Sequence, residues 1–593
     1  MKNKIYNIVC VASMAVALTS CMDTVILPDD VTVGEDFWKN KSDVAKMVNS
    51  AYEGMTSADV LERLLIWGDF RADELVVSNI ESNTTVNNLA EIASISPQVT
   101  NPYVSWAAFY SVINRCNIVL EKAGDVLTDD PNYTEGDYLT DRSQMLALRS
   151  LCYFYLVRNY RDVPYVDEPF MESSKNRDFV QMAPAEVLQK CIESLEEAAS
   201  NAIIASSYGS SDWRRVGWLT RDGIHALLAD VYLWRASVLH SADDYQKAIN
   251  YCDLVIDSKK AQHRTDDASI EKSEYPLADG PKAYGAIFVD QNAEESLFEL
   301  QVRSNLPLCK MLFKYQNANS QMGFMKASRI FASTASKISD ATTQGLVFAT
   351  SDIRMNTSIF SHAADDETFD VRKAISDKLA NGATAESKTA IGRTYGGFQQ
   401  NYIFYRLSDV MLMKAEALVQ QADTTDHSAA GVAASDAKLQ EAFRLVQEVQ
   451  KRSLVVANGT QSADSLQWSG LATIRRSEKS GLELLVLEER LRELCFEGKR
   501  WYDLMRFNYR HVANGVRYDA LMADLGLESL PANYADMLSL ATRRDPNQQA
   551  GLQAKMRNEA YLYLPIPNSD LLLTPTLKQN PVYASSSNKQ TNK

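Results

Sequence analysis

The chain contains paired stretches in which apolar residues recur every three or four positions, and this pattern limits its possible folds more than any other feature. Such spacing places the apolar side chains on one face of an α-helix. Two such helices close in sequence can bury their stripes against each other as an antiparallel pair. The sequence therefore predicts a mainly α-helical fold of tetratricopeptide-like repeats over about residues 104–258 and 401–453. The clearest pairs cover about residues 106–120 with 145–156, 224–232 with 245–256, and 407–418 with 439–449.

Another helical stripe lies near the C-terminus, in the stretch EERLRELCFEGKRWYDLMRF at residues 488–507. Its apolar residues predict a core-facing helix whose charged residues form a solvated opposite face. Ser480 and Glu483 have the spacing of a capping box, which predicts a helix start just ahead of Leu482. Gly498 predicts a kink or a break before a second short helix. We interpret three residues of this stretch as structural: Arg500, Trp501 and Asp503.

The N-terminus has the layout of a secretory signal. Lys2 and Lys4 precede an apolar run that is too short to span a bilayer comfortably and ends at Leu18. The sequence Leu18-Thr19-Ser20-Cys21 looks like a lipobox, which predicts cleavage after residue 20 and lipidation of Cys21. A plain signal peptide followed by an incidental cysteine is the alternative. We therefore expect a signal peptide at 1–20, a lipidated linker at 21–36, and membrane attachment through the lipid anchor only.

Length, charge and cysteine spacing exclude several classes of protein. The 593 residues exceed the roughly 250–300 that one core usually serves, so a repeat stack or several cores are expected. A formal net charge of −15 repels nucleic acid, so we expect no nucleic-acid partner. Histidines and cysteines show no metal-ligand spacing, so we expect neither a metal site nor a cofactor. Six cysteines beyond Cys21 are expected to be buried thiols: Cys116, Cys152, Cys191, Cys252, Cys309 and Cys495.

Residues 67–103 and about 259–400 lack helical periodicity and are rich in polar and turn-forming residues. The first stretch predicts a long loop, and long loops inside folded domains are often functional. The second predicts a loop-rich insertion with small strands. We expect the ligand-binding residues Trp67, Arg71, Asp73 and Tyr103 in the first stretch, and candidate aromatic contacts Tyr315, Phe324, Tyr395 and Phe398 in the second. The alternative for each aromatic residue is simple packing against the core.

The run Glu-Arg-Leu-Arg-Glu-Leu-x-Phe-Glu-Gly-Lys-Arg-Trp-Tyr-Asp-Leu-x-Arg at residues 489–506 resembles the C-terminal signature of the SusD/RagB family. Tyr563-Leu-Pro-Ile-Pro and Gln579-Asn-Pro-Val-Tyr resemble the closing elements of the same family. The resemblance implies one SusD-like domain at 37–583, with the signature region at 480–583 and a polar tail at 584–593. It also implies a surface-exposed nutrient-binding lipoprotein of the outer membrane that captures a glycan, with a peptide as the alternative ligand, and works with a SusC-type TonB-dependent transporter. Family members vary in the two aperiodic stretches, so no ligand residue is carried over.

Two other functions stay open at this point. A glycan-degrading enzyme would need two carboxylates about 5–10 Å apart, one of them in a pocket that raises its pKa. A helical-repeat adaptor for other proteins would instead have a concave face without exposed Trp or Tyr. No nucleophile motif or phosphate loop accompanies the chain's acidic residues, and the family that it resembles is not catalytic, so a binding protein is the expected class.

Overall fold

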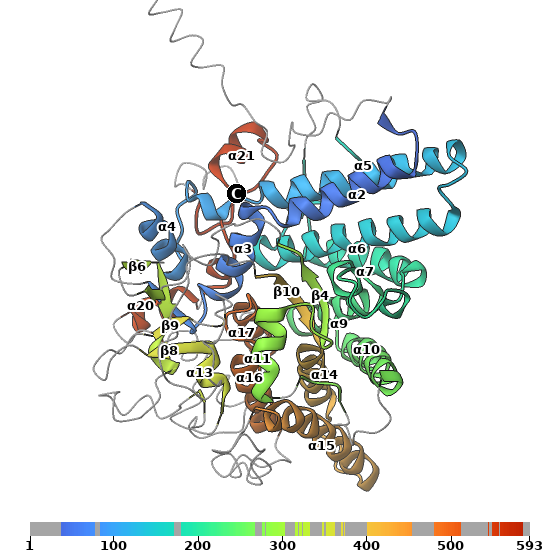
Figure 1. Ribbon diagram of the computed structural model, residues 1–593. Helices are drawn as coiled ribbons and strands as arrows, with labels where there is room; N and C mark the ends of the chain where they lie inside the picture. Colours follow the sequence, from blue (N-terminus) through green and yellow to red (C-terminus); the bar gives the residue numbers. More distant parts are fainter. Residues whose placement is uncertain are drawn as a thin grey trace, which may run out of the picture.

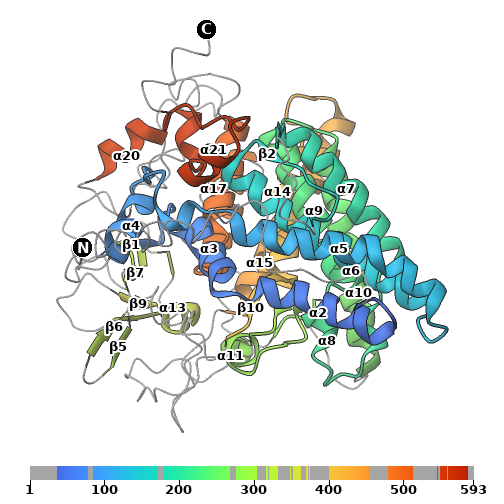
Figure 2. The same cartoon turned by 90° about the horizontal axis from the view of Figure 1, so that it is seen from above.

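Helices make up most of the described part of the computed structural model (Figure 1). In both ribbon views most of the long helices lie on one side, and several of the short strands and short helices lie on the other (Figures 1 and 2). The structure describes residues 37–77, 84–170, 179–266, 275–278, 280–302, 315–317, 320–322, 324–331, 347–348, 352–361, 369–371, 373, 400–453, 479–511, 544, 548–556 and 558–584.

The scaffold is a stack of long helices that follow one another largely in chain order. They are α2 (Lys41–Met55), α5 (Ala107–Asp129), α6 (Glu135–Tyr160), α7 (Pro184–Asn201), α9 (Arg221–Val238), α10 (Asp244–Asp266), α14 (Leu407–Gln421), α15 (Ala429–Lys451), α16 (Lys479–Leu494) and α17 (Arg500–His511). From α5 to α15, each helix of this series packs on the one before it. Helix α16 then packs on both α14 and α15. The predicted fold class, a mainly helical repeat scaffold, is confirmed.

Local sequence explains these helices. Thr134 and Asp137 form a capping box at the start of α6, in which each side chain accepts a hydrogen bond from the other residue's backbone N–H. Only residues 130–134 separate α5 from α6, and so short a connection forces the two helices to run antiparallel. Helix α7 buries one face at helical spacing: Val187, Leu188, Cys191, Ile192, Leu195 and Ala198.

The short strands tie the insertion to the helical scaffold. Strand β10 (Tyr402–Arg406) pairs antiparallel with β4 (Ser296–Leu300), and every residue of both strands is buried. A four-stranded antiparallel sheet has the order β1 (Leu75–Val77), β7 (Met325–Ala327), β9 (Phe369–Val371) and β8 (Ile359–Ser361). Two further pairs join β2 (Val163–Pro164) to β3 (Gln181–Met182) and β5 (Tyr315–Asn317) to β6 (Ser320–Met322).

Shorter helices and single helical turns connect these elements. The α-helices are α3 (Ala58–Asp69), α4 (Thr84–Ala93), α8 (Arg214–Gly217), α11 (Gly280–Tyr284), α13 (Arg354–Ser358), α20 (Gln549–Met556) and α21 (Asn568–Leu573). The 3₁₀ turns are η2 (Pro102–Val104), η3 (Ala205–Ser207), η5 (Arg329–Phe331) and η9 (Glu559–Leu562), and η4 (Gly285–Asp290) is a π-helix. The expected insertion with small strands is therefore present where the structure describes it.

The corner between α16 and α17 depends on two glycines. Gly498 has a φ of +74°, and Phe496 beside it has a φ of +61°, so the helix breaks where the sequence predicts. A Cβ on Gly498 would lie 2.3 Å from the Tyr402 hydroxyl oxygen. A Cβ on Gly68 would lie 2.0 Å from the carbonyl oxygen of Gly498. Both positions thus require glycine because α3 and this corner touch through their backbones.

The prediction of one long loop over residues 67–103 is wrong. Helix α3 continues to Asp69, so Trp67 is helical, and α4 occupies Thr84–Ala93. Val86, Leu89 and Ile92 of α4 are buried on one face, but the interleaved polar residues hide this stripe in the sequence. In the insertion, Tyr315 lies in β5 and Phe324 packs half-buried against the main core, whereas Tyr395 and Phe398 lie outside the described residues.

Five cysteines, at positions 116, 152, 191, 252 and 495, are free thiols in the core, which confirms that expectation. Cys309 lies outside the described residues, as do Cys21, the signal peptide and linker at 1–36, and residues 585–593 of the polar tail. Residues 564–567 are not helical, as their two prolines predict.

Truncation of Trp501 tests the structural role of the C-terminal signature. The side chain is fully buried and the Arg71 guanidinium lies 4.6 Å from its ring centre. Trp501→Ala should therefore lower the free energy of unfolding by about 3–5 kcal/mol, measured by urea denaturation. Trp213→Ala, at a partly exposed tryptophan, is the control and should cost much less. Equal losses in the two variants would contradict a special structural role for Trp501.

Candidate functional site

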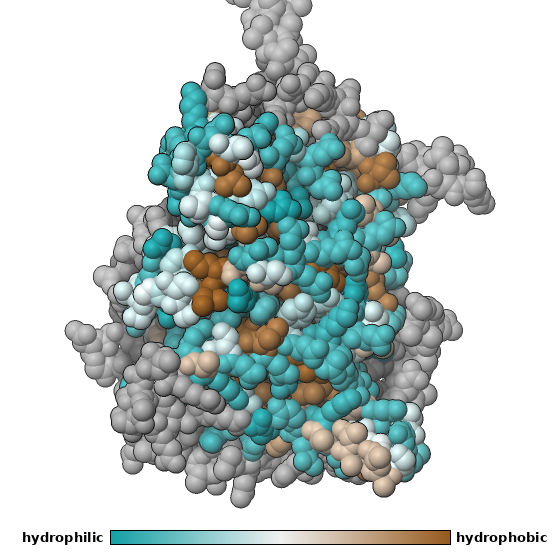
Figure 3. Space-filling model, turned by 90° about the vertical axis from the view of Figure 1, so that its right-hand side faces the viewer, coloured by the Kyte–Doolittle hydropathy of each residue, from teal (hydrophilic) through white to brown (hydrophobic). Residues whose placement is uncertain are grey.

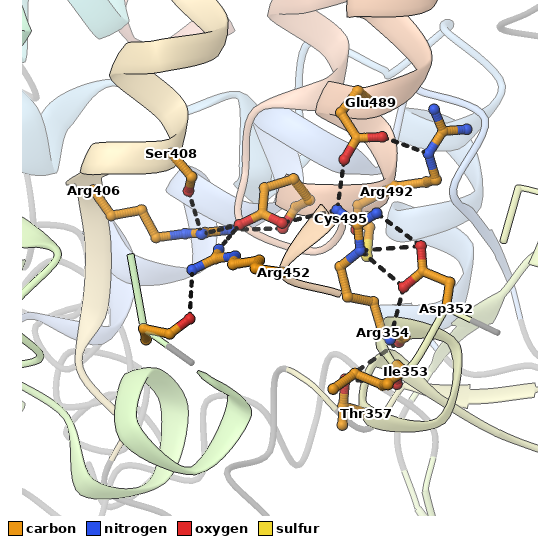
Figure 4. Close-up of polar contacts among 12 residues, drawn as sticks. Asp352, Ile353, Arg354, Thr357, Arg406, Ser408, Arg452, Glu489, Arg492 and Cys495 are labelled. Atoms are coloured by element: carbon orange, nitrogen blue, oxygen red, sulfur yellow. Dashed lines mark hydrogen bonds and ion pairs between the residues drawn. The ribbon is translucent and has the colours of Figure 1, made fainter. Parts of the chain in front are cut away.

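A small pocket that is partly open to solvent lies between α11, η4, α13, the end of α15 and α16. Tyr284, Ile287 and Phe288 give it an apolar wall. Its polar lining is dense in charge, and Figure 4 shows part of this arrangement, with Arg406 and Arg452 at one side and Arg354 at the other. The charged residues that line the pocket are Arg354, Lys373, Arg406, Arg452 and Glu493.

Glu493 of α16 is the centre of the charge network. Its carboxylate accepts hydrogen bonds from Arg354 at 2.9 Å and from Arg406 and Arg452, and its carbonyl oxygen accepts one from Lys373 at 2.7 Å. Burial opposes ionisation of this carboxyl. The guanidinium groups of Arg452, Arg406 and Arg354 outweigh that cost and hold the pKa of Glu493 well below its ordinary value. Glu493 is therefore ionised throughout the physiological pH range.

The surrounding pairs balance the charges of this network. Arg406 also contacts Glu295 at 3.2 Å and Glu497 at 2.8 Å, and Arg354 also contacts Asp352 at 2.7 Å. The described members comprise five cations and five carboxylates, so none of these charges is left over for a ligand. The cations are Arg354, Lys373, Arg406, Arg452 and Arg492, and the carboxylates are Glu295, Asp352, Glu489, Glu493 and Glu497.

The charged residues that line this pocket form a structural clamp, that is, a network of ion pairs that holds separate segments of the chain together. A glycosidase needs a carboxylic acid that keeps its proton near neutral pH, but Glu493, the carboxylate in the pocket lining, has a lowered pKa. Within the described ranges, no three His, Cys, Asp or Glu side chains are placed to hold a metal ion. Among the described residues of its lining, the pocket thus shows neither a protonated acid nor a set of metal ligands.

Helix α17 is fixed by a second set of buried ion pairs. Arg500 pairs with Asp73 at 2.9 Å, and Arg490 pairs with both Asp409 and Asp503 at 2.9 Å. All of these side chains are almost completely buried. The prediction that the charged side of this stretch is solvated is therefore wrong. The structural roles inferred for Arg500, Trp501 and Asp503 agree with this burial.

A carboxyl pair lies beside the same corner. Asp69 accepts a hydrogen bond from the Gly498 N–H at 2.9 Å, and Glu74 accepts one from the Phe496 N–H at 3.5 Å. Burial raises the pKa of Asp69 to about 7. Burial and the charge of Asp69 together raise the pKa of Glu74 well above its ordinary value, so the pair holds a proton at neutral pH. Both carboxyls are completely buried, so a substrate has no access to them.

The residues predicted to bind ligand lie mostly in the core. Trp67 is fully buried, stacks on Phe109 at a ring distance of 5.1 Å, and donates from Nε1 to the Tyr103 carbonyl oxygen at 2.8 Å. Arg71 donates to the Leu562 carbonyl oxygen, and Asp73 is held by Arg500.

This burial corrects the predicted ligand face at Trp67, Arg71 and Asp73, because core packing and internal partners occupy all three side chains. Tyr103 is only half-buried and packs against the core. A ligand role for Tyr103 stays a prediction.

Sequence reasoning missed a group of surface aromatic residues before α9. Tyr208, Trp213 and Trp218 are all partly exposed and lie close together around Arg214. The available signal was three aromatic residues within a short stretch rich in Ser and Gly, which is an unusual composition for a connection between two repeat helices.

The comparisons with known proteins cover both halves of the chain. The model of the SusD family matches residues 318–583, and a second model, described as "Starch-binding associating with outer membrane", matches residues 28–233. The chain belongs to the SusD/RagB family. SusD-like protein P38 of Formosa agariphila is 24% identical to it over 537 residues, which are 87% of this chain and 94% of that protein.

Solved SusD structures share the fold. A SusD homologue from Bacteroides thetaiotaomicron has a TM-score of 0.61 at 19% identity and covers 93% of this chain and 99% of its own. A SusD superfamily protein from Bacteroides vulgatus also has a TM-score of 0.61, at 17% identity over 92% of this chain and 99% of its own. At such identities the likeness establishes the fold alone.

One face of this SusD-family protein is mostly hydrophilic, with apolar residues in small separate groups (Figure 3). Among the helices that the structure describes, none combines the length and the apolar character needed to cross a bilayer.

Substitution of Arg406 tests the clamp. Arg406→Met removes a buried cation that Glu295, Glu493 and Glu497 share, and the uncompensated buried charge should cost about 3–5 kcal/mol of unfolding free energy in urea denaturation. Arg142→Met is the control, because Arg142 pairs with Glu197 at the surface and such pairs contribute about 0–1 kcal/mol. A loss in Arg406→Met no larger than that of the control would contradict the clamp.

The carboxyl pair should make stability depend on pH. Asp69 ionises near pH 4 in the unfolded chain but near 7 when folded, so the folded state loses stability as the pH rises between these values. Asp69→Asn keeps an acceptor for the Gly498 N–H but cannot ionise. Its stability relative to the unsubstituted protein should rise by on the order of 1–3 kcal/mol between about pH 5 and about pH 8 in urea denaturation. Asp59→Asn, at an exposed position of α3, is the control, and an unchanged stability difference in Asp69→Asn would refute the assignment.

Proposed function

We propose that this SusD-family protein binds a glycan at the cell surface and delivers it to a transporter, without catalysing a reaction. The observation that carries the proposal is the match of nearly the whole chain to SusD-like proteins and structures. Glycan binding is supported by the family description, which names starch binding in association with the outer membrane. The absence of a proton-bearing acid from the described lining of the charged pocket supports a binding role rather than hydrolysis.

The proposed location is the outer membrane, with the chain held by lipid at Cys21 and facing the cell exterior. The lipobox-like sequence Leu18-Thr19-Ser20-Cys21 supports the anchor. The family description supports the membrane. Burial of acyl chains contributes about 0.8 kcal/mol per methylene group, so two or more chains would hold the protein firmly.

The proposed partner is a SusC-type TonB-dependent barrel, over which this protein would act as a lid. Family membership supports this partner. Co-purification tests it: antibody against this chain should recover a large β-barrel protein from detergent-solubilised outer membranes. Recovery of the chain alone under mild detergent conditions would count against delivery to a transporter.

A binding screen tests the function itself. The full-length protein in detergent should bind at least one polysaccharide of a broad panel in affinity gel electrophoresis and leave it uncleaved over prolonged incubation. Release of reducing sugar would establish an enzyme instead. Failure to bind any glycan on the panel would refute the glycan-binding proposal.

Replacement of Cys21 tests the anchor. Cys21→Ala should leave the membrane fraction and lack the acyl mass that mass spectrometry detects on the N-terminal peptide of the unsubstituted protein. Cys10→Ala, within the proposed signal peptide, is a matched control and should still be lipidated. A Cys21→Ala protein that remains membrane-bound would contradict lipid anchoring at this residue.

A further inference from the structure

An aromatic cluster lies on the surface between α7 and α9. Tyr208 follows η3, Trp213 precedes α8, and Trp218 follows α8. All three residues are partly exposed. Trp218 lies 6.2 Å from Tyr208 and 6.3 Å from Trp213 between ring centres, and each pair is nearly perpendicular. In Figure 2, α8 lies at the edge of the molecule. We name Tyr208, Asp212, Trp213, Arg214 and Trp218 the aromatic platform.

A salt bridge crosses the aromatic platform. Arg214 donates from Nε and Nη2 to both carboxylate oxygens of Asp212, at 2.6 to 3.1 Å. Its guanidinium carbon lies 4.9 Å from the centre of the Tyr208 ring and 5.8 Å from that of Trp218. Both charged side chains keep substantial solvent exposure. The ion pair of Arg214 and Asp212 therefore lies beside aromatic rings at an accessible surface.

The platform is held rigidly from below. Val216 and Leu219 are buried, and the Leu219 N–H donates to the Tyr52 hydroxyl of α2 at 3.0 Å. A Cβ on Gly217 would lie 2.5 Å from the Trp213 ring, so glycine lets this ring lie against the backbone. Pre-organised rings lose little conformational freedom on binding, which favours affinity.

The charges indicate which ligands fit. Asp212 forms a bidentate ion pair with Arg214 and neutralises its charge, so the platform has little net charge to attract an anion. The whole chain carries a formal charge of −15, which further repels anionic polymers. The C–H groups on one face of a pyranose match the electron-rich face of an aromatic ring, and Asp212 and Arg214 can accept from and donate to its hydroxyl groups.

We propose that the aromatic platform is a binding site for a neutral oligosaccharide, in which sugar rings lie on Trp213 and Tyr208 and hydroxyl groups bond to Asp212 and Arg214. This inference rests on the proposed glycan-binding function and specifies where, and to which class of glycan, the protein binds.

The test measures binding of full-length protein in detergent to two groups of polysaccharides. The neutral group contains starch, laminarin, xylan and mannan, and the acidic group contains polygalacturonate and alginate. We expect binding within the neutral group, weakened on the order of tenfold or more by Trp213→Ala and by Tyr208→Ala. Asp212→Asn should also weaken binding, and this nearly isosteric change at a partly exposed residue separates ligand contact from loss of folding.

The control is Tyr251→Ala, which removes a partly exposed ring that stacks on Tyr232 of α9, outside the platform. It should bind as the unsubstituted protein does. Neutral glycan binding that survives Trp213→Ala, Tyr208→Ala and Asp212→Asn would overturn the platform and leave the proposed function standing. Binding confined to the acidic group would overturn the assigned ligand class. Binding to no polysaccharide at all would refute the proposed function and this site together.

Discussion

The contact between Glu493 and three arginines is the interaction on which the rest of the structure depends. Arg354 comes from the insertion, Arg406 from the end of β10, and Arg452 from the residue after α15. One buried carboxylate thus joins segments that are far apart in the sequence. Removal of a single partner would leave buried charges uncompensated, and this penalty makes the arrangement specific even where its net stabilisation is small. The loop-rich insertion is therefore fixed to the helical stack by charge as well as by apolar packing.

The helical scaffold could be predicted because its helices carry the necessary pattern themselves. The stripe at Ala248, Cys252 and Val255, for example, identifies the helix expected at about residues 245–256 and its buried face without knowledge of the partner. The break at Gly498 was predictable for the same reason, since glycine is a local signal. Fold class and several element positions follow from such local information.

The burial of the charged residues was not predictable from one sequence. Glu493 and Arg500 are charged residues of the kind that an amphipathic helix normally exposes to solvent. Their partners come from distant segments of the chain. Trp67 was misplaced for the same reason, because its position is decided by Phe109 of a different helix. The aromatic platform was missed because Trp213 and Trp218 lie inside the repeat region, where aromatic residues usually pack between helices.

The buried scaffold and the proposed binding surface are thus separate in this SusD-family protein. The signature that identifies the family is buried and holds α16 and α17 in place, whereas the platform lies on a surface connection between α7 and α9. Such a division allows a surface to change its ligand while the buried pairs stay fixed. It also explains why the long C-terminal signature identifies the fold but not the sugar.

A crystal structure of the protein with a bound neutral oligosaccharide tests this separation most directly. The account predicts sugar rings against Trp213 and Tyr208, with Glu493 still held by Arg354, Arg406 and Arg452. Sugar bound between α11 and α16, with Arg406 or Arg452 turned from Glu493 toward the ligand, would contradict it.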